Sequence, residues 1–366
     1  MTNNILAGKL VSVVIPTYNE KDNIVPLVEK INESLIGYNY EIVFVDDNSK
    51  DGTAQAATAL QAKYPVRVLV RKNERGLASA VVHGLKATDA EFAIVMDADL
   101  QHPPSVLPEM IKALETNDVV VGSRYCLGGN PGDRTISRRM ISTVANLLAL
   151  PLVPKVKDRM TGLFAFRRSI VGLESLNAVG WKIGLEVMVR SHAKSIVEVP
   201  YTFVPRVHGT SKLSRRIMWQ YLQQLFRLYM QKYRILNFML VGGIGYGVNM
   251  LTYWPLTLFF KNEVSFLGQT FYLPPFVISS LIAIACNYSL NKIWTFKGWS
   301  EQRLGGLRYL FMASATLLLD MALLFVLVEY GKLPPVPAAA LAILVVFVIR
   351  YVIAKSWVWL DKTPKS

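Results

Sequence analysis

The chain has 366 residues, a length that allows two domains, and its two cysteines exclude a disulfide framework or a cysteine-based zinc site. Its net charge of +14 suits either nucleic acid or an anionic membrane surface. Because apolar residues dominate from about residue 235 onward, the membrane is the favoured partner and nucleic acid is not expected. Residues 1–9 contain no long apolar stretch, so we expect no secretory signal and a cytosolic first half.

The first half of the chain predicts strands that alternate with helices. Apolar runs indicate buried strands at about 10–15, 41–45, 66–70 and 92–96, with helices expected at about 21–34, 52–63 and 76–87. This alternation predicts an α/β, Rossmann-like and mostly parallel sheet with right-handed crossovers. In such sheets ligands bind beyond the carboxyl ends of the strands, so the residues after each strand are the candidates for a site.

Three of these strand ends carry acidic residues. The candidate side chains are Tyr18 and Glu20 after the first strand, Asp46 and Asp47 after the second, and Asp97 and Asp99 after the fourth. A nucleotide-sugar diphosphate carries negative charge, which a hard divalent cation such as Mg²⁺ or Mn²⁺ can neutralise through oxygen ligands. Asp97 and Asp99 could hold that metal and the nucleotide, and Gln101 could add a neutral oxygen. Asp46 and Asp47 could contact the base or ribose, and Tyr18 and Glu20 sit where a base would lie. For each of these four residues, loop capping or turn formation is the alternative.

Basic residues follow the acidic ones. Another apolar strand at 118–121 precedes Arg124, which we expect to face the site and bind pyrophosphate or sugar. Arg206, His208 and Lys212 surround a Gly-Thr-Ser turn that could close over phosphate. A solvated basic loop is the alternative.

Two amphipathic helices are expected at about 135–150 and 214–232. Both combine basic residues with apolar ones at helical spacing, which favours a position flat at a membrane interface. Packing on the sheet is the alternative.

The second half predicts four membrane spans, at about 236–260, 271–295, 307–330 and 336–359. Because Lys and Arg gather at both ends of this half and in its middle linker, we expect these parts, and both chain termini, in the cytosol. The spans also suggest a repeat of two hairpins, since Asn287-Tyr288 and Arg350-Tyr351 precede matching Lys and aromatic residues at the same spacing. Asp320 needs a partner inside the third span, and Arg350 or Lys355 could supply it.

At these motifs the chain resembles the family 2 glycosyltransferases with the GT-A fold, and more narrowly the polyprenyl-phosphate glycosyltransferases related to dolichol-phosphate mannose synthase. The resemblance covers the whole first half. It is carried by Val14-Ile-Pro-Thr-Tyr-Asn-Glu20, Val45-Asp-Asp-Asn-Ser49, Met96-Asp-Ala-Asp-Leu-Gln-His-Pro-Pro104, Gly122-Ser-Arg124 and Thr161-Gly-Leu-Phe164. The second half resembles, more loosely, the four-span GtrA-like domain. We therefore expect a glycosyltransferase domain at 1–212, an interface helix and linker at 213–233, and a transmembrane domain at 234–366.

The resemblance implies roles for the matching positions. Nucleotide and donor binding would fall to Pro16, Tyr18, Glu20, Val45, Asp47, Asp97, Ala98, Asp99, Arg124, Arg206 and Lys212. Asp99 and Gln101 would be the metal ligands, and Asp99 and Arg124 the catalytic residues. Arg138 and Lys182 are candidates for the acceptor phosphate.

The expected reaction is inverting transfer of mannose from GDP-mannose to dolichyl or another polyprenyl phosphate, without an obligate protein partner. Two alternatives stay open. One is a UDP-glucose-dependent enzyme of the same class, and the other is a lipid-linked sugar translocase or scaffold whose first half only binds.

Overall fold

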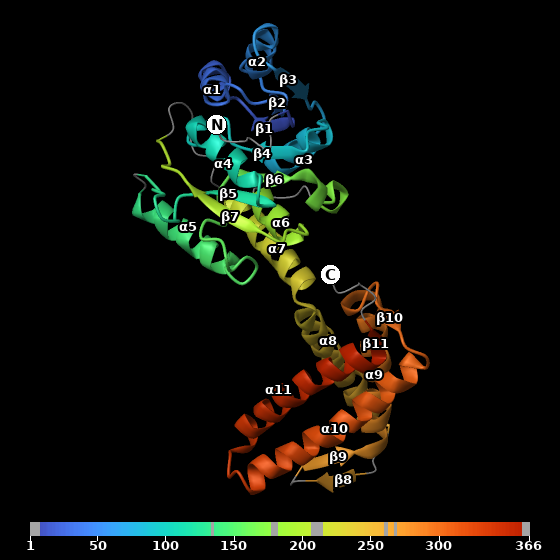
Figure 1. Ribbon diagram of the computed structural model, residues 1–366. Helices are drawn as coiled ribbons and strands as arrows, with labels where there is room; N and C mark the ends of the chain where they lie inside the picture. Colours follow the sequence, from blue (N-terminus) through green and yellow to red (C-terminus); the bar gives the residue numbers. More distant parts are fainter. Residues whose placement is uncertain are drawn as a thin grey trace. The chain divides into compact units, whose positions relative to one another are not determined.

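The computed structural model describes residues 8–132, 135–176, 182–205, 215–259, 263–266 and 269–360. The chain divides into two compact units, Met1–Tyr229 and Met230–Ser366, and each is described by itself (Figure 1). Cys126 lies in the first unit and Cys286 in the second, and both are free thiols, as the sequence predicted.

The first unit contains a seven-stranded sheet with the order β3-β2-β1-β4-β6-β5-β7. Its strands are β1 (Val11–Thr17), β2 (Tyr40–Asp46), β3 (Val66–Val70), β4 (Phe92–Val95), β5 (Val119–Ser123), β6 (Phe164–Arg167) and β7 (Ile196–Pro200). All but β6 run in the same direction. The predicted α/β fold with a mostly parallel sheet is therefore confirmed.

In the part of the chain described, six helices lie between these strands, and a seventh follows the last strand. They are α1 (Lys21–Ser34), α2 (Thr53–Ala59), α3 (Leu77–Lys86), α4 (Leu107–Leu114), α5 (Ile136–Ala149), α6 (Ile183–Arg190) and α7 (Arg215–Lys232). The first three follow the helices expected from the sequence to within a few residues, although α2 ends in a short 3₁₀ turn, Leu60–Ala62. A core of strand residues such as Ile15 and Phe44 packs with Leu27 and Ile31 of α1 and Ile111 of α4.

The predicted alternation does not extend to β6, which lies antiparallel between β4 and β5. After β5 the chain passes through α5 instead of crossing over a sheet face. It then re-enters the sheet at the end where β5 finished, beside the carboxyl ends of the parallel strands. A strand that starts from this end must run antiparallel to β5. This geometry brings the Thr161-Gly162 turn, just before β6, to the carboxyl ends of the parallel strands.

Helix α3 approaches the sheet closely because of Gly84. A Cβ atom at this position would lie 2.6 Å from Val14 Cγ1 and 2.8 Å from Val45 Cγ2. Real Cβ contacts are not so short, so a larger residue would push α3 away from β1 and β2. The close packing therefore seats the later part of α3 directly on β1 and β2.

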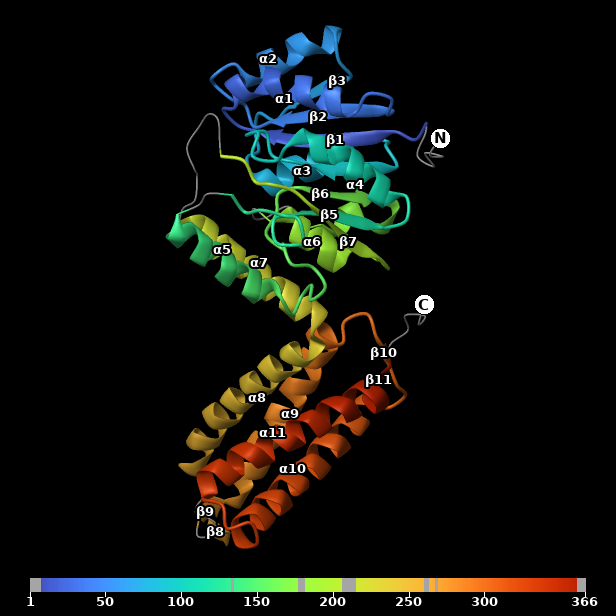
Figure 2. The same ribbon diagram turned by 60° about the vertical axis from the view of Figure 1, so that its left-hand side comes forward.

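In the second unit, four helices among the described residues are long and apolar enough to cross a membrane: Arg234–Thr257, Pro274–Thr295, Gly305–Glu329 and Pro335–Val358. They correspond to α8 (Arg234–Thr257), α9 (Leu273–Leu290), α10 (Gly305–Glu329) and α11 (Pro335–Ile353), and are drawn from yellow to red in Figure 2. Two-stranded pairs join β8 (Glu263–Phe266) to β9 (Gln269–Tyr272) and β10 (Ser300–Glu301) to β11 (Trp359–Leu360). The predicted spans agree with these helices to within a few residues.

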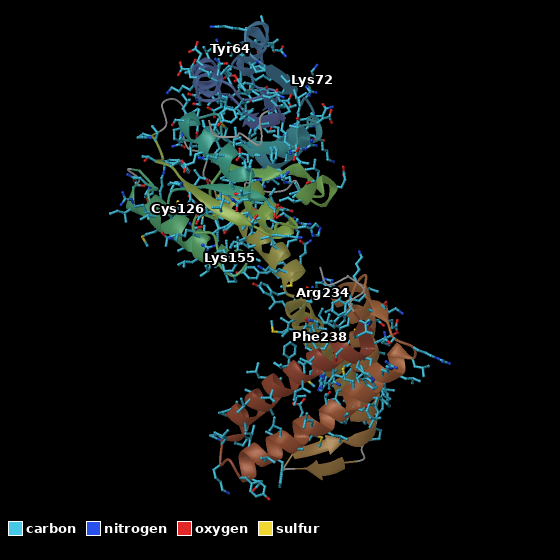
Figure 3. The ribbon with its side chains drawn as sticks, viewed as in Figure 1. Tyr64, Lys72, Cys126, Lys155, Arg234 and Phe238 are labelled. Atoms are coloured by element: carbon cyan, nitrogen blue, oxygen red, sulfur yellow. The ribbon has the colours of Figure 1, made fainter. Side chains whose placement is uncertain are left out.

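The two helix pairs carry the repeat that the sequence suggested. Helix α9 continues into a π-helical turn, Asn291–Thr295, and α11 continues into another, Ala354–Val358. The residues that follow these turns, Phe296 and Trp359, stack on each other with ring centroids 4.4 Å apart. Phe238, near Arg234 at the start of α8 (Figure 3), belongs to the same aromatic cluster. Equivalent residues thus meet where the two hairpins pack.

The repeat places different polar side chains at equivalent positions of the two hairpins. In the second hairpin, Arg350 Nε donates to Thr316 Oγ1 at 2.9 Å, and its Nη2 lies 3.9 Å from Asp320 Oδ2. In the first hairpin the residue equivalent to Arg350 is Asn287, whose amide lies where a Cβ on Gly245 would stand. An uncharged amide therefore occupies, in the first hairpin, the position that the charged Arg350 guanidinium holds in the second.

We expect Arg350→Ala or Asp320→Ala alone to destabilise the second unit by about 1–3 kcal/mol, because each leaves one charge without its partner in the membrane. The double change Asp320→Asn/Arg350→Asn should destabilise the second unit less than either single change. It removes both charges and places at position 350 the amide that Asn287 provides in the first hairpin. Thermal unfolding of the full chain in detergent measures both effects. A double variant that is less stable than both single variants would contradict this account.

Candidate active site

A cavity of about 360 Å³ lies at the carboxyl ends of β1, β2 and β4. Its lining residues are Pro16, Thr17, Tyr18, Glu20, Asp47, Arg75, Gly76, Leu77, Val95, Asp97, Ala98, Asp99, Thr161, Gly162, Phe164, Lys182, Ile183, Gly184 and Ile217. The acidic strand ends predicted from the sequence thus meet in one place. This is where parallel α/β sheets bind ligands.

The loop after β4 holds the two carboxylates of the Asp-Ala-Asp motif. Asp99 is buried, and its Oδ1 accepts a hydrogen bond from the Gln101 backbone N–H at 3.2 Å. The Asp97 side chain is about a third exposed and lines the cavity. Leu100, directly after Asp99, has φ of 60°, a left-handed conformation that is uncommon for a bulky side chain. The loop is therefore held in an unfavourable turn that keeps both carboxylates at the cavity.

The buried side chain of His102 stabilises this loop. The imidazole is almost fully buried, with its ring edge-on to Tyr201 and Phe203. Its Nδ1 accepts a long hydrogen bond, 3.4 Å, from the Asp97 backbone N–H. Burial lowers the pKa of His102 to about 4, so the ring is neutral near pH 7 and can act as this acceptor. Sequence reasoning gave His102 no role, although its place in the Asp-Ala-Asp-Leu-Gln-His block could have suggested one.

Gly162 allows the turn before β6 to pass close to Asp97. A Cβ on this residue would stand 2.4 Å from Asp97 Oδ2 and 3.1 Å from His102 Cε1. We expect Gly162→Ala to displace the Asp97 carboxylate and reduce turnover by roughly 10–100-fold, because small misplacements at a reacting centre are costly. Initial rates of transfer measure this.

The matched control for that change is Gly243→Ala, since a Cβ on Gly243 meets no atom within 4 Å. It should leave turnover unchanged. Equal rates for Gly162→Ala and the unchanged chain would show that Asp97 does not need its present position.

At the other end of the cavity Asp47 is tied to the start of α3. Its Oδ1 accepts a hydrogen bond from Arg71 Nε at 2.8 Å, and its Oδ2 accepts one from the Gly76 backbone N–H at 2.8 Å. The Arg71 guanidinium is buried and also donates to Ser79 Oγ at 2.9 Å. Asp47 therefore positions the entrance of α3 as well as lining the cavity. Sequence reasoning did not identify Arg71.

Asp46 has a different environment. Its Oδ1 accepts a hydrogen bond from Thr17 Oγ1 at 3.1 Å, and its Oδ2 accepts one from the Ser49 backbone N–H at 2.8 Å. These contacts are the loop capping that the sequence left open as an alternative.

Arg75 and Tyr18 form one wall of the cavity. The Arg75 guanidinium carbon lies 5.0 Å from the centroid of the Tyr18 ring, a cation–π distance. Both residues line the cavity, and a flat aromatic ring beside a cation suits a base or a phosphate. Sequence reasoning did not identify Arg75 as a site residue. Its place directly before Gly76, at the N-terminus of α3, is the signal that could have identified it.

The basic candidates are distributed differently. Lys182 lines the cavity, and its Nζ donates to the Met160 carbonyl at 2.7 Å. Arg124 does not line the cavity, and its guanidinium forms a bidentate ion pair with Asp158. Arg138 is exposed on α5. Arg206 and Lys212 lie outside the described residues.

Two further predicted residues do not line this cavity. Val45 is buried in β2, where its side chain packs against α3 at Gly84. Gln101 donates from Nε2 to the Val204 carbonyl at 3.5 Å. The Gln101 side chain thus lies beside the Asp97–Asp99 loop rather than in the cavity wall.

The cavity offers ligands for a divalent cation. The carboxylates of Asp97 and Asp99 supply hard oxygen donors in one loop. Among the described residues no group of three or more His, Cys, Asp or Glu side chains could hold a metal. This donor set fits a hard cation that one or two carboxylates hold together with substrate phosphates, the way Mg²⁺ is usually bound.

Comparison with known proteins adds to this geometry. The profile of Glycosyl transferase family 2 matches residues 12–172, and that of the GtrA/DPMS transmembrane domain matches residues 237–359. A dolichol-phosphate mannosyltransferase of Pyrococcus furiosus is 37% identical over 362 residues, which cover 95% of this chain and 99% of the relative. One of Saccharomyces cerevisiae is 37% identical over 262 residues, covering 68% and 94%. Glucosyl-3-phosphoglycerate synthase of Mycobacterium tuberculosis, a solved structure, matches with a TM-score of 0.46 at 24% identity, covering 60% and 80%.

Proposed function

Since this chain belongs to the dolichol-phosphate mannosyltransferases and is a glycosyltransferase with a GT-A-like fold and a membrane domain, we propose that it takes mannose from GDP-mannose. The acceptor is dolichyl phosphate or another polyprenyl phosphate, and the anomeric centre is inverted. One structural observation supports this proposal most directly. A single cavity joins Tyr18 and Arg75, which suit a base and its phosphates, to the carboxylates of Asp97 and Asp99.

The donor lies along this cavity in our proposal. Pro16, Tyr18, Glu20 and Asp47 hold the nucleoside, and Arg75 adds charge beside its phosphates. Asp97 and Asp99 face the diphosphate, where two carboxylates alone would repel it. A Mg²⁺ or Mn²⁺ ion held by Asp99 and Asp97, with Gln101 beside them, would neutralise the diphosphate as the nucleotide leaves.

The acceptor needs no strong general base. The second pKa of a phosphate monoester is about 6, so the attacking oxygen is already anionic near neutral pH. The protein must instead offset the repulsion between two phosphate-bearing substrates and align them. Lys182 is suited to hold the acceptor phosphate, because its ammonium is fixed at the cavity wall by the Met160 carbonyl. Attack in line with the departing nucleotide inverts the anomeric carbon.

Arg124, Arg138, Arg206 and Lys212 stay proposals for phosphate or sugar binding. For Arg124 this requires that the guanidinium act at the substrate while it remains paired with Asp158. For Arg138 it requires that the acceptor lipid pass along α5.

We also propose the arrangement of the chain in the membrane. The catalytic domain at 1–212 lies in the cytosol in this proposal. The interface helix and linker at 213–233 connect it to the transmembrane domain at 234–366. The basic linker with Lys297, Arg303 and Arg308 supports this, since cytoplasmic linkers carry the excess of Lys and Arg. Reporter fusions after the first and second spans test it. A cytosolic reporter after the first span would contradict it.

The decisive experiment is transfer by the purified full chain in detergent. Dolichyl phosphate is incubated with GDP-mannose, UDP-glucose and other nucleotide sugars, and the lipid products are identified by mass spectrometry. We expect mannosylated lipid from GDP-mannose alone. Preferred use of UDP-glucose would overturn the donor, while the absence of every lipid-linked product would overturn the acceptor class.

A further inference from the structure

A second cavity, of about 290 Å³, lies in the first unit beneath α5. It is lined by Tyr125, Thr143, Asn146, Leu147, Leu150, Lys157 and Arg159. None of these residues lines the active-site cavity. In Figure 3, Cys126, next to Tyr125, and Lys155, in the loop that follows α5, mark this region. The proposed reaction uses none of these side chains.

Arg159 gives this cavity its chemistry. The residue is only 7% exposed, and its guanidinium donates to two backbone carbonyls, to Val153 O at 2.8 Å from Nε and to Pro154 O at 3.3 Å from Nη2. Its backbone N–H donates to Asn146 Oδ1 at 2.9 Å, which fixes the loop against α5. Burial also lowers the pKa of Arg159. The structure therefore holds a positive charge in a poorly solvated place.

Neither Arg159 nor Lys157 has a carboxylate within ion-pair distance in the described part of the chain. The nearby carboxylate of Asp158 is taken by Arg124. Glu198 Oε1 accepts the backbone N–H of Asp158 at 2.9 Å. The charges of Glu198 and Asp158 act on Arg159 from beyond ion-pair distance, and burial still lowers its pKa. Because this buried cation has no direct ion pair, an anion that enters the cavity would be stabilised there.

The mouth of the cavity is apolar. Leu147 and Leu150 line it and are 60% and 40% exposed, and Met140 and Val144 continue this exposed surface along α5. Helix α7 lies beside α5 in both Figure 1 and Figure 2, with Tyr221 Oη donating to Ala145 O at 2.6 Å. A soluble anion would gain nothing from such an apolar rim. An anion joined to an acyl chain would bury the chain against these leucines.

We propose that the cavity beneath α5 binds the phosphate head group of an anionic membrane phospholipid, with Arg159 and Lys157 contacting the phosphate and the acyl chains lying along α5. The reacting acceptor lipid is a different molecule, because its phosphate must reach the cavity that contains Asp97 and Asp99. The site therefore goes beyond the proposed transfer reaction. Basic pockets next to apolar surfaces are the usual lipid head-group sites of membrane proteins.

Native mass spectrometry of the full chain tests this site, with phosphatidylglycerol as the probe and phosphatidylcholine as its neutral comparison. Arg159→Gln and Lys157→Gln should each weaken phosphatidylglycerol binding by about tenfold, because each removes a charge-assisted hydrogen bond. The matched controls are Lys155→Gln in the same loop and Arg139→Gln on α5, both exposed and outside the cavity lining. They remove the same charge and should leave binding unchanged.

Thr143→Leu narrows the cavity without changing its charge and keeps the test valid if Arg159→Gln fails to fold. It should also weaken phosphatidylglycerol binding. Equal losses in the cavity variants and in the two controls would overturn the site, because unspecific surface charge would then explain binding. A rise in KM for dolichyl phosphate with unchanged phosphatidylglycerol binding would overturn it too, since the cavity would then serve the acceptor.

Discussion

Replacing Asp99 with Asn is expected to reduce mannose transfer by about 10²–10³-fold, the scale of removing one essential electrostatic contact at a reacting centre. The change keeps the shape of the side chain but removes its charge and replaces one oxygen donor with an amide group. Asp99 is buried, so no water can take over the role of the lost oxygen without rearrangement. Initial rates of lipid-linked product formation in the presence of Mg²⁺ or Mn²⁺ measure the loss.

The control for Asp99→Asn is Asp89→Asn, which removes the same charge from an exposed position outside the cavity. It should retain full turnover. Binding of the donor to Asp99→Asn should also lose its dependence on the divalent cation, which calorimetric titration with and without metal can show. Near-full turnover of Asp99→Asn would mean that the Asp97–Asp99 loop is not the metal and diphosphate site.

The elements around β1, β2 and β4 could be predicted from the sequence because their signals are local. Apolar runs that end in acidic loops identify a buried strand and its carboxyl end together, and Asp47 and Asp97 accordingly line one cavity. The antiparallel β6 could not be predicted in this way. Its direction depends on the path of the chain from β5 through α5, which no residue pattern in Phe164–Arg167 records.

The candidate site shows the same limit. Sequence patterns identify acidic groups at strand ends, but they do not tell which charges are already paired. Arg124 follows a strand just as Asp97 does, yet its partner Asp158 lies 34 residues further along the chain. Arg71, which holds Asp47, and Gly162, which makes room for Asp97, also act through contacts between distant segments. Such pairings become visible only in the folded chain.

Removing Asp158 should have the largest effect on stability in the first unit. Its carboxylate is fully buried and accepts hydrogen bonds from Arg124 Nε at 2.6 Å and Nη2 at 2.7 Å, as well as from the Arg124 backbone N–H at 3.0 Å. Asp158→Ala leaves a buried guanidinium without its partner, which typically costs about 3–5 kcal/mol. Domains are stable by only about 5–15 kcal/mol, so we expect a large fall in the unfolding temperature and in the yield of folded protein.

The double change Arg124→Met/Asp158→Leu separates the two roles of Arg124. Replacing a buried ion pair by apolar residues of similar size is often nearly neutral, so this variant should unfold within a few degrees of the unchanged chain. If Arg124 also acts on the donor or acceptor, as we propose, the folded double variant should lose transfer by roughly 10²-fold or more. A folded double variant with full turnover would show instead that Arg124 only holds the end of β5 to the loop before β6, and that Lys182 and the Asp97–Asp99 loop suffice for the phosphates.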